Sequence, residues 1–302
     1  MSKYILGIDA GGTKTDACVA DLSGKIIAIA GNGAAQWERV GLSKTQSALD
    51  LVITEALAKA GAVKSEVAKA TFAMSGIDWP SDVEMMRPII AAIGFTTNVS
   101  IINDAFAALY AGVPDGDGIA SIAGTGGKTV GQHNGKSFQT MGMRMGEAGG
   151  AGQVIGMALD RIAMEIHGQR PRSVLSIQIP ALFGFTDVME FFEAHTRGGL
   201  RFEEDRTPLI FELAHDGDQA SAEIIKSVAK QHAEDVIGIA KQLEFDGDPF
   251  KVVRAGGLHT CGSTLFDDVF NNEIVNALPG AKTEVLKDLP VYGAINHALK
   301  YS

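Results

Sequence analysis

Short runs of apolar residues, each closed by glycine or a polar residue, divide the first part of the chain. The first run, 4–8, is rich in β-formers and ends at Asp9 and a Gly-Gly pair, which predicts a strand and a tight turn. Residues 15–21 alternate, and a third strand is predicted over 25–29 after a short polar turn. The chain is therefore predicted to open as an antiparallel meander whose first turn is rich in glycine.

The pattern then changes to strands and helices in alternation. Apolar residues recur at helical spacing over 45–60 and 82–93, and short β-rich runs lie at 70–74 and 99–102. A further helix is expected over 105–110, directly after the second of these strands. Alternation of this kind predicts parallel strands joined by crossover helices.

The opening pattern returns after a polar, turn-rich segment at 113–118. A strand over 118–123, a glycine-rich turn and a second strand over 128–132 follow it. Two strand–glycine–strand units about 115 residues apart indicate a duplicated architecture. The sequence thus predicts two domains that share one plan.

The second half of the chain is more helical than the first. Helical spacing extends over 153–167 and over 220–243, and a last helix is expected near the C-terminus. We predict an α/β protein with domains at 1–114 and 115–290, and a closing segment, 291–302, that packs back on the first domain.

Composition and charge narrow the class of protein. Of the 302 residues, 46% are hydrophobic and 21% are charged, which is ordinary for a globular protein. The 36 acidic residues outnumber the 26 basic ones, for a formal charge of −10, so binding to nucleic acid or to an anionic membrane is not expected. No apolar run approaches the roughly 18–20 residues of a membrane helix, and no signal peptide precedes the first strand, so we expect a cytoplasmic protein.

Three residue types bear on candidate chemistry. Cys18 and Cys261 stand alone, which gives neither a disulfide framework nor zinc-ligand spacing, and His232 lies on an apolar helical stripe and is expected in the core. Glycine is over-represented, with 36 residues, or about 12% of the chain against a usual share of about 7%. Many glycines form pairs: Gly11-Gly12, Gly126-Gly127, Gly149-Gly150, Gly198-Gly199 and Gly256-Gly257.

The first pair lies in a segment that could bind phosphate. The segment contributes Asp9, Gly11, Gly12, Thr13, Lys14 and Thr15. Its glycines lack β-carbons and let backbone N–H groups approach an anion closely, while two threonines and a lysine add hydroxyl donors and positive charge. Asp9 could hold Mg²⁺ through water, because hard cations prefer carboxylate oxygen. A plain Gly-Gly hairpin explains the same residues equally well.

A second glycine-rich turn, Gly124-Thr125-Gly126, stands at the corresponding point of the repeat. The residues that follow, 127–129, match the end of a P-loop motif. However, Ile122 stands where that motif needs its first glycine, and the segment leads into a strand rather than a helix. A second phosphate-binding hairpin therefore fits better.

Two further places could carry chemistry. Asp104 follows the strand at 99–102, where ligands of α/β sheets gather and a carboxylate could act as a general base. On local pattern alone, the role of N-cap to the next helix is favoured for this residue. Gly256 and Gly257 follow a strand at 251–255 and could let a nucleobase lie against the backbone, although a simple strand-to-helix turn is an equal alternative.

In this order, the features resemble the actin-like ATPase and sugar-kinase superfamily, and within it the N-acetylglucosamine kinase branch, the BadF/BadG/BcrA/BcrD ATPase family. The resemblance spans nearly the whole chain. It is carried by residues 7–15, 73–78, 103–105, 123–126, 255–257 and 292–294. It implies two actin-like (ribonuclease H-like) domains, each a mixed β-sheet flanked by helices, with the nucleotide in the cleft between them.

The resemblance also implies roles for single residues. The loops at 9–15 and 124–126 would hold the phosphates of ATP together with Mg²⁺, and the Gly256-Gly257 pair would contact the adenosine. Asp104 would take the proton from the attacking sugar hydroxyl, with Asn103 beside it at the sugar. The implied reaction is ATP-dependent phosphorylation of an amino sugar such as N-acetylglucosamine, at the 6-hydroxyl.

Two positions depart from the family's pattern. Gln36 stands where an asparagine usually contacts the sugar, and the family's Gly-Asp-Glu-Gly-Ser segment appears here as residues 146–150. Glu147 matches the family's aspartate in one register and Ala148 does in another. In either register one acidic group and the serine are missing.

These departures leave alternatives open for the function. The sugar could be glucosamine or another hexosamine, or the chain could be an ATPase or a sugar sensor of the same fold without sugar kinase activity. Related ATPases that drive electron transfer carry cysteines for an iron–sulfur cluster, and the two solitary cysteines here argue against that activity. ATP, ADP and a sugar are the expected partners, and a homodimer is left open.

Overall fold

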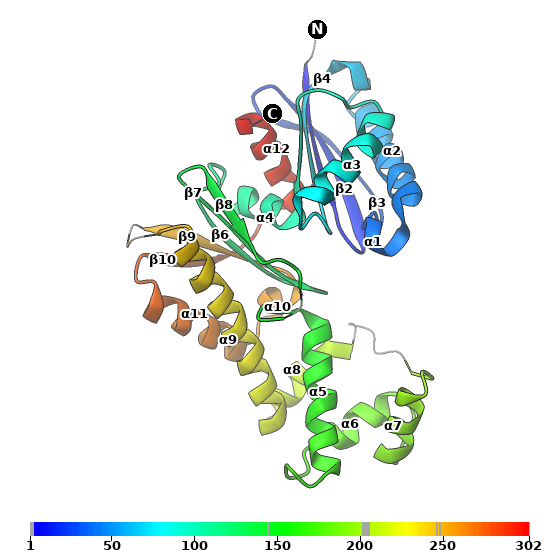
Figure 1. Cartoon of the computed structure of the whole chain (residues 1–302), viewed down its shortest axis with the longest axis vertical. Coiled ribbons are helices and arrows are strands. Elements are labelled where there is room, and N and C mark those ends of the chain that lie inside the picture. The colour runs from blue at the N-terminus through cyan, green and yellow to red at the C-terminus, as the bar shows by residue number, and fades with distance from the viewer. Residues whose placement is uncertain (1–2, 144, 201–205, 246, 248, 302) are drawn as a thin grey trace.

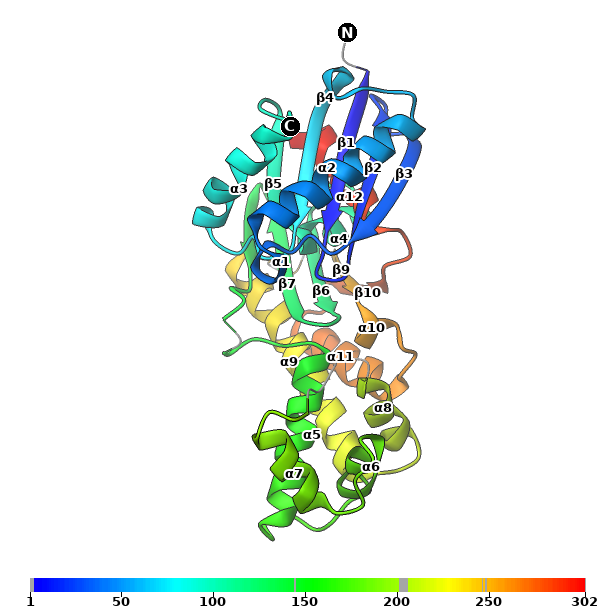
Figure 2. The same ribbon diagram turned by 90° about the vertical axis from the view of Figure 1, so that its right-hand side faces the viewer.

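Two lobes, each built around a five-stranded sheet, make up the chain (Figure 1). The computed structural model describes residues 3–143, 145–200, 206–245, 247 and 249–301. Helices flank both sheets, and a helical extension continues beyond the second sheet (Figure 2). The predicted α/β class, with two mixed sheets flanked by helices, is confirmed.

The first sheet has the strand order β3-β2-β1-β4-β5. Its strands are β1 (Tyr4–Ala10), β2 (Lys14–Asp21), β3 (Ile26–Gly33), β4 (Val67–Met74) and β5 (Val99–Asn103). The first three pair antiparallel, and β4 and β5 add in parallel on the other side of β1. The predicted meander and crossover strands are confirmed.

The second sheet repeats this plan, with the order β10-β9-β6-β7-β8. Its strands are β6 (Gly118–Ala123), β7 (Gly127–His133), β8 (Lys136–Gln139), β9 (Phe250–Ala255) and β10 (Ala281–Val285). Again three strands form an antiparallel meander, and two add in parallel beside the first of them. The predicted duplication is confirmed, and the glycine turns β1–β2 and β6–β7 occupy equivalent places.

Alternate side chains of β1 pack on opposite faces of the first sheet, as the period of a strand requires. Leu6 and Ile8 face α2 (Leu42–Lys59) and α3 (Pro80–Ala92), and a short 3₁₀ turn, η1 (Lys64–Glu66), leads from α2 into β4. Ile5 faces α12 (Pro290–Tyr301) on the other side. Gly7 permits the close approach of α12, since a β-carbon there would lie 3.0 Å from the backbone of that helix.

Two helices lie between the sheets, and each packs on the sheet that it does not directly follow in sequence. α4 (Asp104–Gly112) follows β5 of the first sheet but packs on the second, while α12 follows β10 of the second sheet and packs on the first. The core around α4 consists of Ala105, Leu109, Val113, Ala120, Val130 and Val253. The helices cross closely, because a β-carbon on Gly293 would lie 1.9 Å from the Ala107 oxygen. The packing therefore crosses the predicted boundary after residue 114, which stays a prediction.

The remaining helices of the second lobe cover the far face of the second sheet and extend away from it. They are α5 (Ala151–Ile166), α6 (Leu175–Leu182), α7 (Val188–Thr196), α8 (Thr207–His215), α9 (Gln219–Gln242), α10 (Gly257–Thr260) and α11 (Thr264–Ala277). Ile119 and Val252 of the sheet share one core with α9 and α11. In the part of the chain that the structure describes, no helix has the length and apolar character to span a bilayer.

Candidate active site

The two lobes meet beside the glycine turns. Lys128, near the start of β7, places its Nζ 2.6 Å from Oδ1 of Asp78, in the loop after β4. Gln139, at the end of β8, donates from Nε2 to the backbone oxygen of Asp78 at 2.8 Å. Both contacts join the first lobe to the second, at the ends of the sheets that face each other (Figure 2).

The first glycine turn is a tight hairpin with charged side chains around it. The Gly11 N–H donates to the Lys14 oxygen at 2.9 Å, and Nζ of Lys14 lies 2.6 Å from Oδ2 of Asp16. Thr15 is buried, and its hydroxyl donates to the Gly33 oxygen at 2.8 Å. Thr15 thus braces the hairpin, whereas the backbone of the turn lies partly open.

Carboxylates gather at the strand ends of the first lobe. Burial raises the pKa of Asp9 to about 7, and the negative charges of Asp104 and Asp16 add to the effect. This excess of negative charge would be relieved by a divalent cation, and Mg²⁺ prefers carboxylate oxygen and bound water. No cluster of three or more His, Cys, Asp or Glu side chains with the spacing of a metal site occurs among the described residues. Asp9 is a single carboxylate that suits a water-mediated contact with Mg²⁺, and this contact stays a prediction.

Asn103, rather than Asp104, caps the helix that follows β5. Its Oδ1 accepts the Ala105 N–H at 3.0 Å, and its Nδ2 donates to Asp78 Oδ1 at 3.0 Å and to the Ile77 oxygen at 3.3 Å. The cap that local pattern favoured for Asp104 is therefore wrong by one residue, because the loop at 77–78 holds the Asn103 amide in the capping position. Asn103 itself is buried against this loop.

Asp104 is the first residue of α4 and is partly buried. Burial raises the pKa of its carboxyl to about 6, with the charge of Lys128 opposing the rise and that of Asp78 adding to it. A carboxyl group with this pKa is mostly ionised at neutral pH and can still accept a proton from a substrate. The predicted base thus lies between the first glycine turn and a cation of the second lobe.

A short helix, α1 (Trp37–Val40), lies over the first glycine turn. A β-carbon on Gly12 would lie 2.9 Å from Oε1 of Gln36 and 3.4 Å from Nη1 of Arg39. The indole Nε1 of Trp37 donates to the Gly76 oxygen at 3.0 Å and ties α1 to the loop after β4. Gln36, expected at the sugar, therefore lies against the first glycine turn, next to Arg39.

Two other glycine pairs surround the second turn. A β-carbon on Gly150 would lie 2.2 Å from the Gly124 oxygen, and one on Gly256 would lie 2.5 Å from the carbonyl carbon of Ala123. Gly256 also has a φ of 92°, which favours glycine. Gly126 is exposed, and a β-carbon there would meet no atom within 4 Å. The turn is thus closely supported from two sides and is exposed at Gly126.

The segment that departs from the family's pattern contacts the second lobe and the loop after β4. Oε2 of Glu147 accepts the Gly142 N–H at 3.1 Å, and a β-carbon on Gly142 would lie 2.9 Å from Oδ2 of Asp78. The Ala148 N–H donates at 2.8 Å to Oδ2 of Asp235 on α9. Of the two registers considered, the one that uses Glu147 places a carboxylate near Asp78.

The whole fold and the set of motifs together agree with one family model. That model, described as the BadF/BadG/BcrA/BcrD ATPase family, matches residues 6–299. The chain belongs to this family. The resemblance inferred from the glycine turns, Asp104 and the Gly256-Gly257 pair is confirmed.

Individual members and solved structures agree with this assignment. An N-acetylmuramic acid/N-acetylglucosamine kinase of Clostridium acetobutylicum is 24% identical over 299 residues, 97% of either chain. An N-acetyl-D-glucosamine kinase of Dictyostelium discoideum is 26% identical over 301 residues, 93% of either chain. The structure of a candidate N-acetylglucosamine kinase of Chromobacterium violaceum matches with a TM-score of 0.70 at 20% identity, over 99% of both chains, and shows that the actin-like fold is shared.

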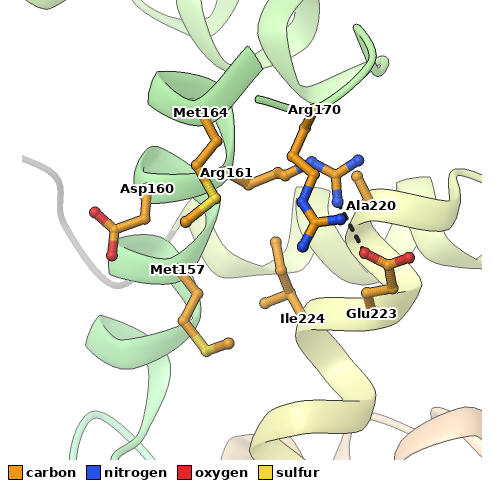
Figure 3. A pocket seen from close by; sticks show the side chains of 8 residues that line it. All are labelled: Met157, Asp160, Arg161, Met164, Arg170, Ala220, Glu223 and Ile224. Carbon is orange, nitrogen blue, oxygen red and sulfur yellow. Dashed lines mark hydrogen bonds and ion pairs between the residues drawn. The ribbon is translucent and has the colours of Figure 1, made fainter. Parts of the chain in front are cut away.

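A surface cavity of this BadF-family chain lies away from the glycine turns, between α5 and α9 (Figure 3). Its volume is about 250 Å³, and Met157, Met164 and Ile224 contribute to its wall. Arg161 at its edge is paired with Glu223 at 2.8 Å. Its charges are mixed, and none of the predicted site residues lines it.

Three charged side chains at or near the site were not predicted from the sequence. Arg39 and Lys128 bring cations to the first and second turns, and Asp235 brings a carboxylate beside Glu147. Lys128 had one available signal, since it follows the second glycine turn as Lys14 follows the first. Arg39 and Asp235 carry no local signal, because their positions depend on how α1 and α9 pack.

Proposed function

We propose that the chain is an ATP-dependent sugar kinase that transfers the γ-phosphate of ATP to the 6-hydroxyl of an amino sugar such as N-acetylglucosamine. The observation that carries the proposal is Asp104, a partly buried carboxylate with a pKa raised to about 6, whose charge interacts with Asp9 of the first lobe and with Lys128 of the second. The names of the two curated relatives support the same activity, since each is aligned over more than nine-tenths of its length.

Asp104 acts as the general base. The sugar hydroxyl oxygen forms a bond to the γ-phosphorus, the bond from that phosphorus to the bridging oxygen of ADP breaks, and the hydroxyl proton passes to the carboxylate. Asp104 stands at the N-terminal end of α4, where the position of its backbone is fixed by the Asn103 cap. Positioning and charge, rather than covalent chemistry, supply most of the rate enhancement in such a transfer.

The glycine turns bind the phosphates, and the nucleotide lies between the lobes. Gly126 leaves room for an anion, and Arg39 and Lys128 add positive charge from the two sides. Asp9 would hold Mg²⁺ through water, and the ion would supply further positive charge to the transferring phosphoryl group. The Gly256-Gly257 pair, next to the second turn, contacts the adenosine.

The sugar contacts the loop after β4 and the segment around Glu147. Asp78 and Gly142 approach each other there from the two lobes, and Asn103 holds the loop in place. Both tryptophans of the chain flank this loop, because Trp37 bonds to Gly76 and Trp79 follows Asp78. Sugar binding is therefore expected to change the intrinsic fluorescence.

A second candidate substrate is glucosamine or another hexosamine with a free amino group. The charge of Glu147 contributes to raising the pKa of Asp235 to about 6, after the larger effect of burial, so the two carboxylates lie close together. Paired carboxylates favour a positively charged ammonium group over a neutral acetamide. This arrangement supports glucosamine as the alternative to N-acetylglucosamine.

The test is ADP release with MgATP and a panel of sugars that contains N-acetylglucosamine, glucosamine, N-acetylmuramic acid, glucose and no sugar. We expect release that depends on a hexosamine and follows the fluorescence titration of the same sugar. ADP release that is equal with and without every sugar would contradict a sugar kinase and favour an ATPase. Binding of sugar without any ADP release would favour a sensor.

A further inference from the structure

A chain of three buried polar side chains runs beneath the second glycine turn. His232 of α9 bonds through Nδ1 to the hydroxyl of Ser121 on β6 at 3.3 Å, and that hydroxyl bonds to Nε2 of His259 on α10 at 3.1 Å. The Nε2 of His232 bonds to the Gly149 oxygen at 2.8 Å. His232 and Ser121 are fully buried and His259 is 2% exposed, so His232 occupies the core, as its position on the apolar stripe predicts.

The direction of every hydrogen bond in the chain follows from one acceptor. The Gly149 oxygen can only accept, so Nε2 of His232 carries the hydrogen, and burial holds the pKa of that ring at about 4 and keeps it neutral. Its Nδ1 is therefore bare and accepts the Ser121 O–H. The Ser121 oxygen in turn accepts the Nε2–H of His259, whose Nδ1 is left as a bare nitrogen. The His259 Nδ1 is buried with no hydrogen-bond partner among the described residues, so no acceptor there calls for a hydrogen on this nitrogen.

The ends of this chain lie at the two supports of the second glycine turn. Gly149 precedes Gly150, which packs on the Gly124 oxygen, and the Ala151 N–H donates to that same oxygen at 2.8 Å. At the other end, the His259 N–H donates to the oxygen of Gly256, the residue that packs on Ala123, at 3.1 Å. One continuous set of hydrogen bonds therefore joins α9, β6 and α10 to both supports of the turn.

We propose that His232, Ser121 and His259 are positioning residues that set the second glycine turn and the Gly256-Gly257 pair for nucleotide binding. The inference rests on the proposed function in so far as the turn binds ATP. These side chains touch no substrate. They fix the positions of Gly150 and Gly256, which pack on the turn from two sides. The backbone of the turn is then already ordered before the phosphates bind. Loss of this order lowers the affinity for the nucleotide.

A buried histidine–hydroxyl pair in the first lobe supplies a matched control. Nδ1 of His297 on α12 lies 3.1 Å from the Thr71 hydroxyl on β4, and burial lowers the pKa of this ring to about 4 as well. The pair is comparable in burial and bond length to the Ser121–His259 bond. It contacts neither glycine turn among the bonds of the described residues, so its loss costs stability without altering the nucleotide site.

The experiment measures binding of MgADP and of a non-transferable MgATP analogue by calorimetry. The variants are Ser121→Ala, His232→Phe, His232→Gln and the control Thr71→Val. We expect Ser121→Ala and His232→Phe to weaken nucleotide binding about tenfold with the sugar affinity unchanged. His232→Gln restores much of the loss, because its amide can still donate to the Gly149 oxygen, and Thr71→Val binds as the parent does. Ser121→Ala removes one oxygen only and keeps the test valid if the ring replacement does not fold.

Nucleotide affinities of Ser121→Ala and His232→Phe equal to that of the parent would overturn the inference. An equal loss in Thr71→Val would also overturn it, because the effect would then reflect stability alone. A parent protein that binds no nucleotide would overturn both this inference and the proposed function. A parent that binds nucleotide but phosphorylates no sugar would contradict only the proposed function. Nitrogen-15 spectra that show His232 or His259 protonated on Nδ1 would contradict the bonding scheme itself.

Discussion

The two glycine turns occupy equivalent places in two sheets of the same plan, yet different groups surround them. The first is surrounded by charged side chains, with Asp9 and Lys14 in the hairpin and Arg39 above it. The second is packed against backbone, because Gly150 and Gly256 press on it from two sides. In the same fold, the first turn therefore has charged side chains around it, and the second has a backbone held in place by its neighbours.

The carboxylates of the site and its closely packed turn therefore belong to different lobes. Asp9 lies on β1 of the first sheet, and Asp104 begins α4, which follows β5 of the same sheet. The second lobe contributes Lys128, whose charge acts on Asp104, and a turn whose shape is set by its neighbours. Loss of the Asp104 carboxylate should therefore act on the rate of transfer, and changes in the packing of the second turn on nucleotide binding.

The largest expected effect comes from Asp104→Asn. The amide keeps the shape of the side chain but cannot accept the proton, so kcat should fall by about 10²- to 10⁴-fold while MgATP binds with the parent's affinity. Steady-state rates and calorimetry on the same preparation check this. Turnover of the variant at the parent rate would remove Asp104 from the role of base.

Gly150→Ala tests whether the second turn needs the close packing of Gly150. Its new β-carbon would lie 2.2 Å from the Gly124 oxygen, so the loop must shift, which should cost about 1–3 kcal/mol of stability and weaken nucleotide binding. Gly152→Ala is the matched control, because a β-carbon there meets no atom within 4 Å and alanine favours the helix by about 1 kcal/mol. Chemical denaturation and nucleotide titration of both variants decide the point. Two variants that behave alike would show that the close packing at Gly150 does not matter.

The exposed Gly126 separates packing from ligand contact. Gly126→Ala should leave stability nearly unchanged, because its β-carbon meets no protein atom, but should weaken nucleotide binding by occupying the space of a phosphate. The measurement is the same pair of titrations. Parent-like nucleotide affinity in this variant would mean that the phosphates lie elsewhere.

Stability should depend on pH through buried histidines, of which His232 and His259 lie in the second lobe and His297 packs on the first, since burial lowers the pKa of all three. The pKa values of His232 and His297 are lowered to about 4 by burial, against 6.5 in the unfolded chain. Between these values the unfolded chain binds more protons, so each ring lowers stability as the pH falls from 6.5 towards 4, by about 2 kcal/mol at pH 5. Urea denaturation of the parent, His232→Phe and His297→Phe across this range measures each share. A variant with the same pH slope as the parent would exclude its ring from the effect.

The smallest expected effect is electrostatic and joins the two lobes. The charge of Lys128 lowers the pKa of Asp104 and that of Asp78 raises it. Lys128→Met should therefore move the acid limb of kcat/KM to higher pH, and Asp78→Asn should move it to lower pH, with rates near pH 6 changed about three- to tenfold in opposite senses. Complete pH profiles at fixed magnesium concentration test this. Shifts in the same direction would separate the limb from the ionisation of Asp104.

The sequence predicted what depends on local pattern. Alternating apolar residues and the placement of glycines predicted two meanders, each with a glycine turn. In the structure the two meanders and their turns occupy equivalent positions in the two sheets. The helix cap after β5 was assigned one residue late, because asparagine and aspartate cap equally well and only the contact of Asn103 with Asp78 decides between them.

Contacts between distant segments could not be predicted. The approach of Gly150 to Gly124 and the pairing of Lys128 with Asp78 depend on how α5, β7 and the loop after β4 pack, and no spacing in the sequence encodes them. Glycine pairs signal that space is needed but not which segment fills it. The Gly149-Gly150 pair is an example, since its place against the second turn became clear only in the folded chain.

The most direct test of the account is to identify the phosphorylated product. The protein is incubated with MgATP and either N-acetylglucosamine or glucosamine, and phosphorus-31 spectra are recorded beside an assay of ADP. We expect one sugar phosphomonoester, with the phosphate on the 6-hydroxyl, for every ADP formed, and none with Asp104→Asn. Inorganic phosphate formed in place of a sugar ester, at the same rate with and without sugar, would contradict it.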